Sequence, residues 1–98
     1  MEPQERNDKL DNLNAEIYYL TLDLHNLTRE LNKLGSLIDS GSITLDKEKE
    51  SEIWDLTEEH IAISNDLIIK LNEYFKIEKE LNIPISLSYR SLYRQLTA

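Results

Sequence analysis

The sequence predicts an all-α fold: a long antiparallel helical hairpin with coiled-coil-like packing and a short C-terminal helix, associating into a helical bundle. Apolar residues recur at alternating steps of three and four through the first 38 residues, as in a coiled coil. Only two glycines and two prolines interrupt 98 residues. Two stretches of near-equal length flank the tract DSGSITL, which favours a hairpin of two helices.

The two long helices are expected at about residues 5–38 and 46–82, with Gly35 as a possible breaker near the end of the first. No capping box follows Asp46, because Lys49 stands where a Glu or Gln would be needed. The acidic residues at 46, 48, 50 and 52 still favour a helix N-terminus, since they complement its partial positive charge.

The apolar residues at heptad positions a and d form what we call the seam, which is predicted to bring helices together for assembly. Its members are Leu10, Leu13, Ile17, Leu20, Leu24, Leu27, Leu31, Leu34, Ile53, Leu56, Ile63, Leu67 and Tyr74. A second row, with Trp54, Ile61, Ile68 and Phe75 at b positions, widens the apolar face of the second helix. A face this wide needs a third helix or another chain to cover it.

The charges constrain which edge of the hairpin is covered. The g positions of both helices are acidic, whereas the e positions carry mostly Thr, Ser, Asn and Gly. The apolar faces therefore lean toward e and b, which leaves the acidic g rows at the solvent rim. Two helices alone bury too little surface for a stable domain, so a bundle of two hairpins is favoured.

Residues 1–83 are thus assigned to the hairpin and residues 84–98 to a short amphipathic segment that begins at Pro84. Ser86 or Ser88 is expected to cap a short helix, with Ile85, Tyr89, Leu92 and Leu96 on one face. This segment either docks on its own hairpin or binds a larger partner. In the first case Tyr89, Leu92 and Leu96 are expected to cover part of the wide face around Ile61, Ile68 and Leu71, with Arg90 and Arg94 reaching toward the acidic rim.

Several residues outside the seam are candidate partner contacts: Tyr18, Tyr19, Trp54, Tyr89, Arg90, Leu92, Tyr93 and Arg94. Aromatic and arginine side chains are favoured at the centres of protein interfaces. The alternative is that Tyr18, Tyr19 and Leu22 pack within the protein's own bundle, against the third segment or a second hairpin.

Composition excludes several classes of function. The net charge of −8 argues against direct nucleic-acid binding, which needs a basic surface. The most apolar tract, IAISNDLIIKL, is too short and too polar for membrane insertion. Without cysteine there is no thiolate site or disulfide framework. No signal peptide is recognised at the start, so an intracellular, soluble protein of the cytoplasm or nucleus is expected.

No residue pattern indicates catalysis, a cofactor or a metal. Neither His60 nor His25 follows a glutamate at the three-residue spacing that a di-metal bundle needs. The many carboxylates form a solvated face rather than a catalytic pair, because no pocket or perturbing neighbour is indicated. A Gly-rich phosphate loop and a Ser/His/Asp set are also missing. We therefore expect no enzymatic activity.

The tract SNDLIIKLNEY resembles the signature of the small aspartyl-phosphate phosphatases of sporulating bacteria, which are also short helical hairpins. Ser64, Asn65, Asp66, Leu67 and Tyr74 carry the resemblance. Ile68 stands where that signature has an acidic residue. Because this residue is the chemical core of the motif, no phosphatase activity is assigned.

These observations favour a non-catalytic assembly subunit or adaptor that mediates protein–protein interaction, as a homodimer or as a hetero-oligomer with another helical protein. The alternative is a small acidic inhibitor whose carboxylates mask a basic, nucleic-acid-binding site on a partner protein.

Overall fold

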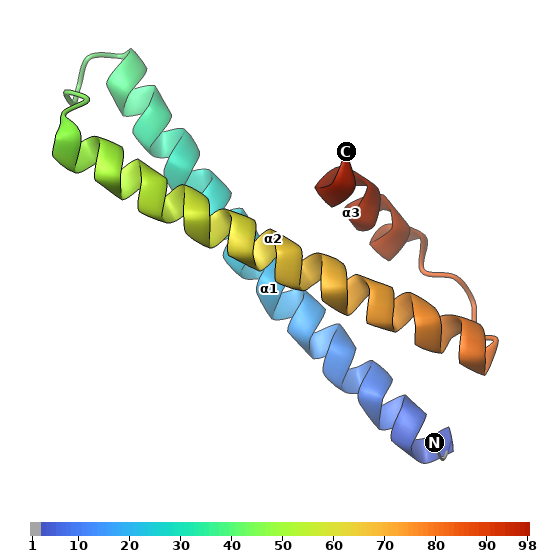
Figure 1. The fold of residues 1–98 in the computed structure, drawn as a ribbon. Coiled ribbons are helices and arrows are strands. Elements are labelled where there is room, and N and C mark those ends of the chain that lie inside the picture. Colours follow the sequence, from blue (N-terminus) through green and yellow to red (C-terminus); the bar gives the residue numbers. More distant parts are fainter. Residues whose placement is uncertain (1–2) are drawn as a thin grey trace.

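The computed structural model describes residues 3–98 and confirms the all-α hairpin with a short C-terminal helix. Helix α1 spans Pro3–Asp39, α2 spans Lys47–Leu81 and α3 spans Leu87–Thr97. Figure 1 shows α1 and α2 side by side and antiparallel, with α3 beside α2 at the end far from the α1–α2 loop. The molecule is elongated, with extents of 57 × 20 × 17 Å.

Left-handed residues end both long helices. Gly41 has φ +76°, and the Ser42 and Gly41 amides donate to the carbonyls of Leu37 and Ile38. Asn82 has φ 52°, and the Ile83 amide donates to the Glu78 carbonyl. This hydrogen-bond pattern is the Schellman motif, which satisfies the last carbonyls of a helix. Both helices therefore stop where the sequence supplies a residue that tolerates positive φ.

The N-termini of α2 and α3 are capped by side chains. Asp46 accepts a hydrogen bond from the Lys49 amide at 2.9 Å, and Ser86 accepts one from the Tyr89 amide at 3.3 Å. Ser86, rather than Ser88, thus caps the short helix. Gly35 does not break α1, which continues to Asp39. One glycine costs a helix only about 1 kcal/mol, which the flanking turns and seam contacts outweigh.

The two glycines make a matched prediction. Gly35→Ala should stabilise the protein by about 0.5–1 kcal/mol, because alanine favours a helix and a Cβ there meets no atom within 4 Å. Gly41→Ala should destabilise it by about 1 kcal/mol, because its φ is left-handed. Urea unfolding measures both values. Shifts of the same sign would contradict the assignment of these two positions.

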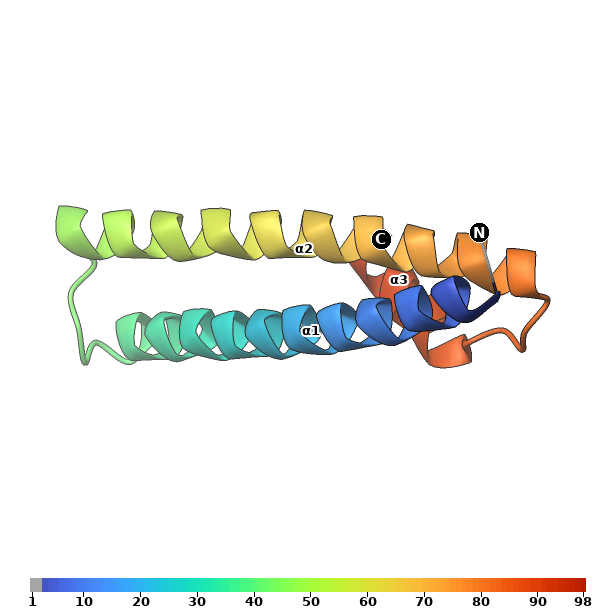
Figure 2. The same ribbon diagram turned by 90° about the horizontal axis from the view of Figure 1, so that it is seen from below.

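The core is concentrated at the end of the hairpin that carries α3. Leu10, Leu13 and Ile77 form one buried cluster, and Ile17, Leu67 and Leu71 form another. Toward the α1–α2 loop, Leu27 is the one further buried apolar side chain within residues 4–98. Figure 2 shows the reason: α3 lies against the opposite end, and no third helix accompanies α1 and α2 near the loop.

Candidate interaction surface

Helix α3 packs on the protein's own hairpin, as one of the two sequence-based alternatives predicts. Its face of Tyr89, Leu92, Tyr93 and Leu96 lies on the cluster of Ile17, Leu67 and Leu71. Leu67 and Leu71 are 0% exposed and Ile17 is 1% exposed. These three are the most deeply buried side chains described, because α1, α2 and α3 all meet there.

Aromatic pairs and one hydrogen bond fix the position of α3. The Tyr89 ring meets the Tyr74 ring edge to face, with centroids 4.8 Å apart, and Tyr93 meets Phe75 in the same way at 5.7 Å. The Tyr89 hydroxyl donates to Asn14 Oδ1 at 2.6 Å. Tyr89 therefore contacts both long helices and ties α3 to α1 as well as to α2.

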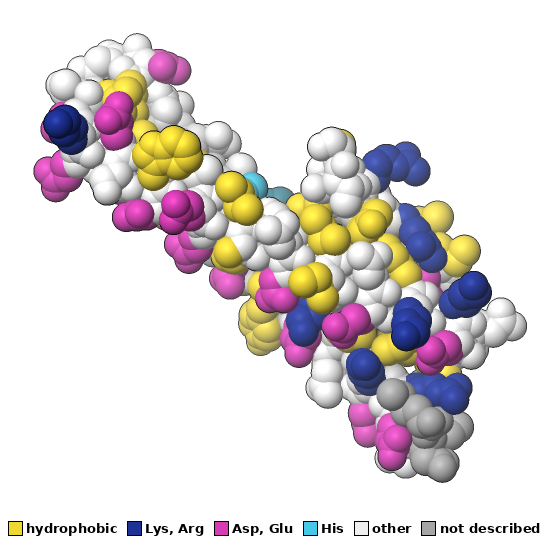
Figure 3. All heavy atoms as spheres, in the orientation of Figure 1, with side chains coloured by type: hydrophobic (Ala, Val, Ile, Leu, Met, Phe, Trp, Pro, Cys, Tyr) yellow, Lys and Arg dark blue, Asp and Glu magenta, His cyan; other side chains and the backbone are white. Residues whose placement is uncertain are grey.

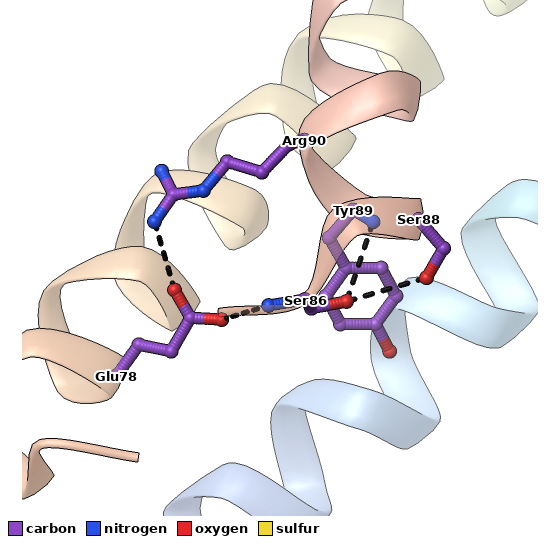
Figure 4. A network of polar contacts seen from close by, with 5 residues as sticks. All are labelled: Glu78, Ser86, Ser88, Tyr89 and Arg90. Atoms are coloured by element: carbon purple, nitrogen blue, oxygen red, sulfur yellow. Dashed lines mark hydrogen bonds and ion pairs between the residues drawn. The ribbon is translucent and has the colours of Figure 1, made fainter. Parts of the chain in front are cut away.

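A buried carboxylate anchors the start of α3. Glu78 is 2% exposed; its Oε2 accepts from the Ser86 amide at 2.8 Å and its Oε1 from Arg90 Nη2 at 2.9 Å. The Arg90 guanidinium also lies 4.1 Å from the centroid of the Phe75 ring. Figure 4 shows Glu78 pointing from α2 toward Ser86 and Arg90. Both carboxylate oxygens are thus satisfied, which burial of a charge requires.

The Tyr89 hydroxyl makes α3 docking sensitive to alkaline pH. Burial, followed by the nearby Tyr74 hydroxyl, raises the pKa of Tyr89. A group whose pKa is higher in the folded state contributes its full stability below its unfolded value of about 10. That contribution is lost as pH rises through the folded pKa, because ionised tyrosine no longer donates a hydrogen bond.

We therefore expect Tyr89→Phe to cost about 1 kcal/mol at neutral pH, through loss of the hydrogen bond to Asn14. The difference in free energy of unfolding between wild type and variant should shrink above about pH 10. Urea unfolding at neutral and alkaline pH measures it. A difference that stays constant across this range would contradict the role assigned to the hydroxyl.

Beyond α3, the same face of the hairpin carries no carboxylate, ammonium or guanidinium group at the a, b and e positions within residues 24–35 and 53–64. We call this part of the face the charge-free strip; nearer the loop, Asp39, Lys47 and Glu50 occupy such positions. The members of the strip are Leu24, His25, Thr28, Leu31, Asn32 and Gly35 on α1, and Ile53, Trp54, Thr57, His60, Ile61 and Ser64 on α2. Trp54 is 66% exposed and Ile61 is 54% exposed. His60 Nε2 and Thr28 Oγ1 lie 3.1 Å apart, which links the two helices across the strip.

The acidic side chains follow a different edge. Those at g positions, which the heptad pattern places away from α3, are Glu16, Asp23, Glu30, Glu52, Glu59, Asp66, Glu73 and Glu80. Lys70 pairs with Glu16 at 3.2 Å and Lys49 pairs with Glu52 at 3.0 Å. The hydrogen bond and charge of Glu16 raise the pKa of Lys70. In Figure 3, apolar side chains extend from α3 toward the loop, while acidic ones line the lower edge of α2.

The structure divides the predicted site residues into three groups. Among seam residues, Leu10, Leu13, Ile17, Leu27 and Leu67 are buried, and Leu20, Leu24, Leu31, Leu34, Ile53, Leu56, Ile63 and Tyr74 are half-buried. Of the candidate partner contacts, Tyr89, Leu92 and Tyr93 pack on the chain's own core. Tyr18, Tyr19, Trp54, Arg90 and Arg94 are exposed.

The prediction that the tail covers part of the apolar face of α2 is confirmed at Leu71, whereas the placement of Ile85 and the ion-pair partners of the two arginines are wrong. Ile85 precedes α3 and is 62% exposed, so it does not share the helix's buried face. Helix α3 covers Leu71 but leaves Ile61 exposed, because it ends near the middle of α2. Arg90 pairs with Glu78 rather than with an acidic g residue, and Arg94 forms no ion pair within residues 3–98.

Sequence reasoning missed the roles of Glu78 and Asn14. Both occupy e positions. Glu78 follows Thr57, Ser64 and Leu71 in the e row of α2, and Asn14 lies in the e row of α1. The sequence signal for Glu78 was a carboxylate at the end of a run of uncharged e residues. Glu78 binds the segment after Pro84, whose charged residues are both arginines, where that segment packs back on α2.

No group of three or more metal-ligating side chains lies together in the part of the chain that the structure describes. None of the helices within residues 3–98 is sufficiently long and apolar to span a membrane. Comparison with protein-family models, with curated proteins and with solved structures finds no significant match.

Proposed function

We propose that the protein is a non-catalytic assembly subunit or adaptor, which binds other helical proteins through apolar helix surfaces. The observation that carries this proposal is the charge-free strip. Trp54 and Ile61 are 66% and 54% exposed there, on a chain with a net charge of −8. Exposed aromatic and aliphatic side chains on one uncharged face are typical of a protein interface.

The packing of α3 supports the same proposal. The face that continues into the strip already binds one amphipathic helix, through apolar contacts with Ile17, Leu67 and Leu71. Helix-in-groove binding uses this kind of surface. The groove between α1 and α3, of about 440 Å³ and lined by Ile17, Tyr18 and Leu92 among others, adds further concave surface at the border of the strip.

The second candidate function is a small acidic inhibitor that masks a basic site on a partner protein. The acidic g positions favour it, because they gather carboxylates on one edge of the hairpin, whereas the strip on the other edge is uncharged. In that case the partner would be held by the carboxylates, and the strip would face away from it. The two candidates therefore differ in which edge binds and in how binding responds to salt.

The test is capture of partner proteins from a native extract by the immobilised protein at low and high salt. The assembly function predicts binding that survives about 0.5 M salt, because apolar contacts are little screened. Trp54→Glu, on the strip, should abolish this binding, and Asp66→Asn, on the acidic edge, should preserve it. Binding that is lost in high salt and lost in Asp66→Asn would support the inhibitor instead.

A further inference from the structure

We infer that the charge-free strip is a self-association surface, on which a second copy of this chain docks its own strip in antiparallel orientation. The inference rests on the proposed assembly function and names the partner for one surface. Two α1–α2 hairpins would thereby form a four-helix bundle at their loop ends. Continuity with the α3 site, charge, shape and surface area support this pairing.

The strip continues a surface that is already an interface within the chain. Helix α3 covers a, b and e positions, among them Ile17, Leu71 and Phe75. The b positions of α2 nearer the loop, Ile61 and Trp54, have the same apolar character but are 54% and 66% exposed. Figure 2 shows the long helices continuing past α3 to the loop. The loop half of the hairpin therefore lacks the third layer that the other half has.

Charge allows a second copy as the occupant of the strip, although not of the acidic edge. At a net charge of −8, two copies repel each other wherever carboxylates face carboxylates. The acidic edge meets that condition, because Glu59 and Asp66 lie on it, along the same part of α2 that carries the strip. The strip itself presents only Thr, Ser, Asn, His, Gly and apolar side chains. It is thus a face on which two acidic chains approach without like charges in contact.

Shape selects the antiparallel orientation. Helix α3 packs on the a, b and e positions that continue into the strip. It therefore stands out from α2 at the end of the strip farther from the loop (Figure 1). A parallel pair would bring the two α3 helices into collision. An antiparallel pair, related by a two-fold axis midway between Lys47 and Leu67 on α2, places each α3 next to the loop end of the other copy. Each strip then meets itself, as an isologous interface requires.

The surface area fits a reversible dimer. At 1.5 Å per residue, residues 47–64, the part of α2 on the loop side of α3, extend about 27 Å, so a face as wide as the 20 Å molecule offers roughly 500 Å² per copy. Two copies would bury on the order of 1,000 Å², at the lower limit for a specific interface. We therefore expect a dimer that forms with a dissociation constant in the micromolar range.

Two isoleucines on α2 provide a matched test. Ile61 is 54% exposed and lies on the strip at a b position, whereas Ile69 is 55% exposed and lies at a c position, beside the acidic edge. Ile61→Glu and Ile69→Glu add the same charge at equal exposure on the same helix. The mass of each full-length protein is measured by sedimentation and light scattering over about 1–500 μM, and circular dichroism verifies that both remain helical.

We expect the wild type and Ile69→Glu to approach twice the 11.5 kDa chain mass with rising concentration. Ile61→Glu should weaken association at least about tenfold, because it places a carboxylate inside the interface. Trp54→Glu, also on the strip, should do the same and serves if Ile61→Glu loses helicity.

A wild type that stays monomeric at the highest concentration overturns the inference, as does equal weakening by Ile61→Glu and Ile69→Glu. Association that neither strip variant weakens overturns it too. These outcomes are separate from a failure of the proposed function. A monomeric protein that still captures a partner in high salt, through Trp54, retains the assembly function with another protein on the strip. A protein that stays monomeric and also captures no partner in high salt overturns the proposed function as well.

Discussion

Leu67→Asp is expected to unfold the protein. Leu67 is 0% exposed and packs where Ile17 of α1, Leu71 of α2 and the apolar face of α3 meet. Removing a buried leucine side chain costs about 2–5 kcal/mol, and a buried carboxylate without a partner adds several more. The sum, roughly 5–10 kcal/mol, reaches the lower half of the stability range of a typical small domain, about 5–15 kcal/mol. A protein this small lies at the low end of that range. Circular dichroism at room temperature should show the loss of most helical signal.

Asn65→Asp is the control for added charge, since Asn65 is exposed on the same helix two residues earlier. It should change the free energy of unfolding by less than about 0.5 kcal/mol. Leu67→Ala separates the cavity from the charge and should remain folded with a stability reduced by about 2–5 kcal/mol. A folded Leu67→Asp with near wild-type stability would mean that the three helices do not meet at this residue.

Deletion of residues 84–98 is expected to destabilise the hairpin by several kcal/mol. The deletion uncovers Ile17, Leu67 and Leu71, on which four half-buried side chains of α3 pack. Full burial of one large apolar side chain contributes roughly 1.5–3 kcal/mol, so four half-buried ones contribute about 3–6 kcal/mol together. The melting temperature of the truncated chain, measured beside that of the full chain, tests this directly.

The loss should depend little on salt. The ion pair between Arg90 and Glu78 is part of the α3 contact, but the Arg90 side chain is 42% exposed, so apolar packing dominates the energy. Arg90→Gln in the full chain isolates the charged contact, and its effect should be smaller than that of the deletion. If the truncated protein melted at the wild-type temperature and lost a binding partner, α3 would be an outward-facing ligand instead.

The hairpin could be predicted from sequence because its signals are local and repeated. The recurrence of Leu10, Ile17, Leu24 and Leu31 fixes the inner face of α1 over several turns, and helix length follows from the positions of Gly41 and Pro84. The uncharged e positions also indicated correctly which edge of the hairpin is covered. Helix ends differed by one or two residues, which is the usual uncertainty at frayed termini.

The position of α3 along the hairpin was less predictable, because it depends on contacts between residues far apart in the chain. The Tyr89–Asn14 hydrogen bond joins residues 75 positions apart, and no local pattern encodes it. The turn at Asn82 and the Glu78 anchor set where α3 begins, so its 11 residues reach Leu67 but not Ile61. The candidate interaction surface is defined by that limit, since the strip is the part of the apolar face that α3 leaves open.

Unequal cover implies unequal stability along the hairpin. The half beside α3 contains six of the seven buried apolar residues, and the loop half contains only Leu27 within the described part of the chain. Segments with few buried contacts open at lower free energy than the core. A second copy on the strip would raise the opening free energy of the loop half alone, because binding stabilises only the segments it contacts.

Hydrogen exchange of individual amides at low and high protein concentration therefore tests whether the interaction surface is confined to the charge-free strip. At low concentration, amides of residues 24–38 and 47–60 should exchange faster than those of residues 10–20 and 64–78, which lie beside α3. At high concentration, protection should rise in residues 24–38 and 47–63 and stay constant beside α3. Protection that is equal in both halves, or that rises uniformly with concentration, would contradict an interaction surface confined to the charge-free strip.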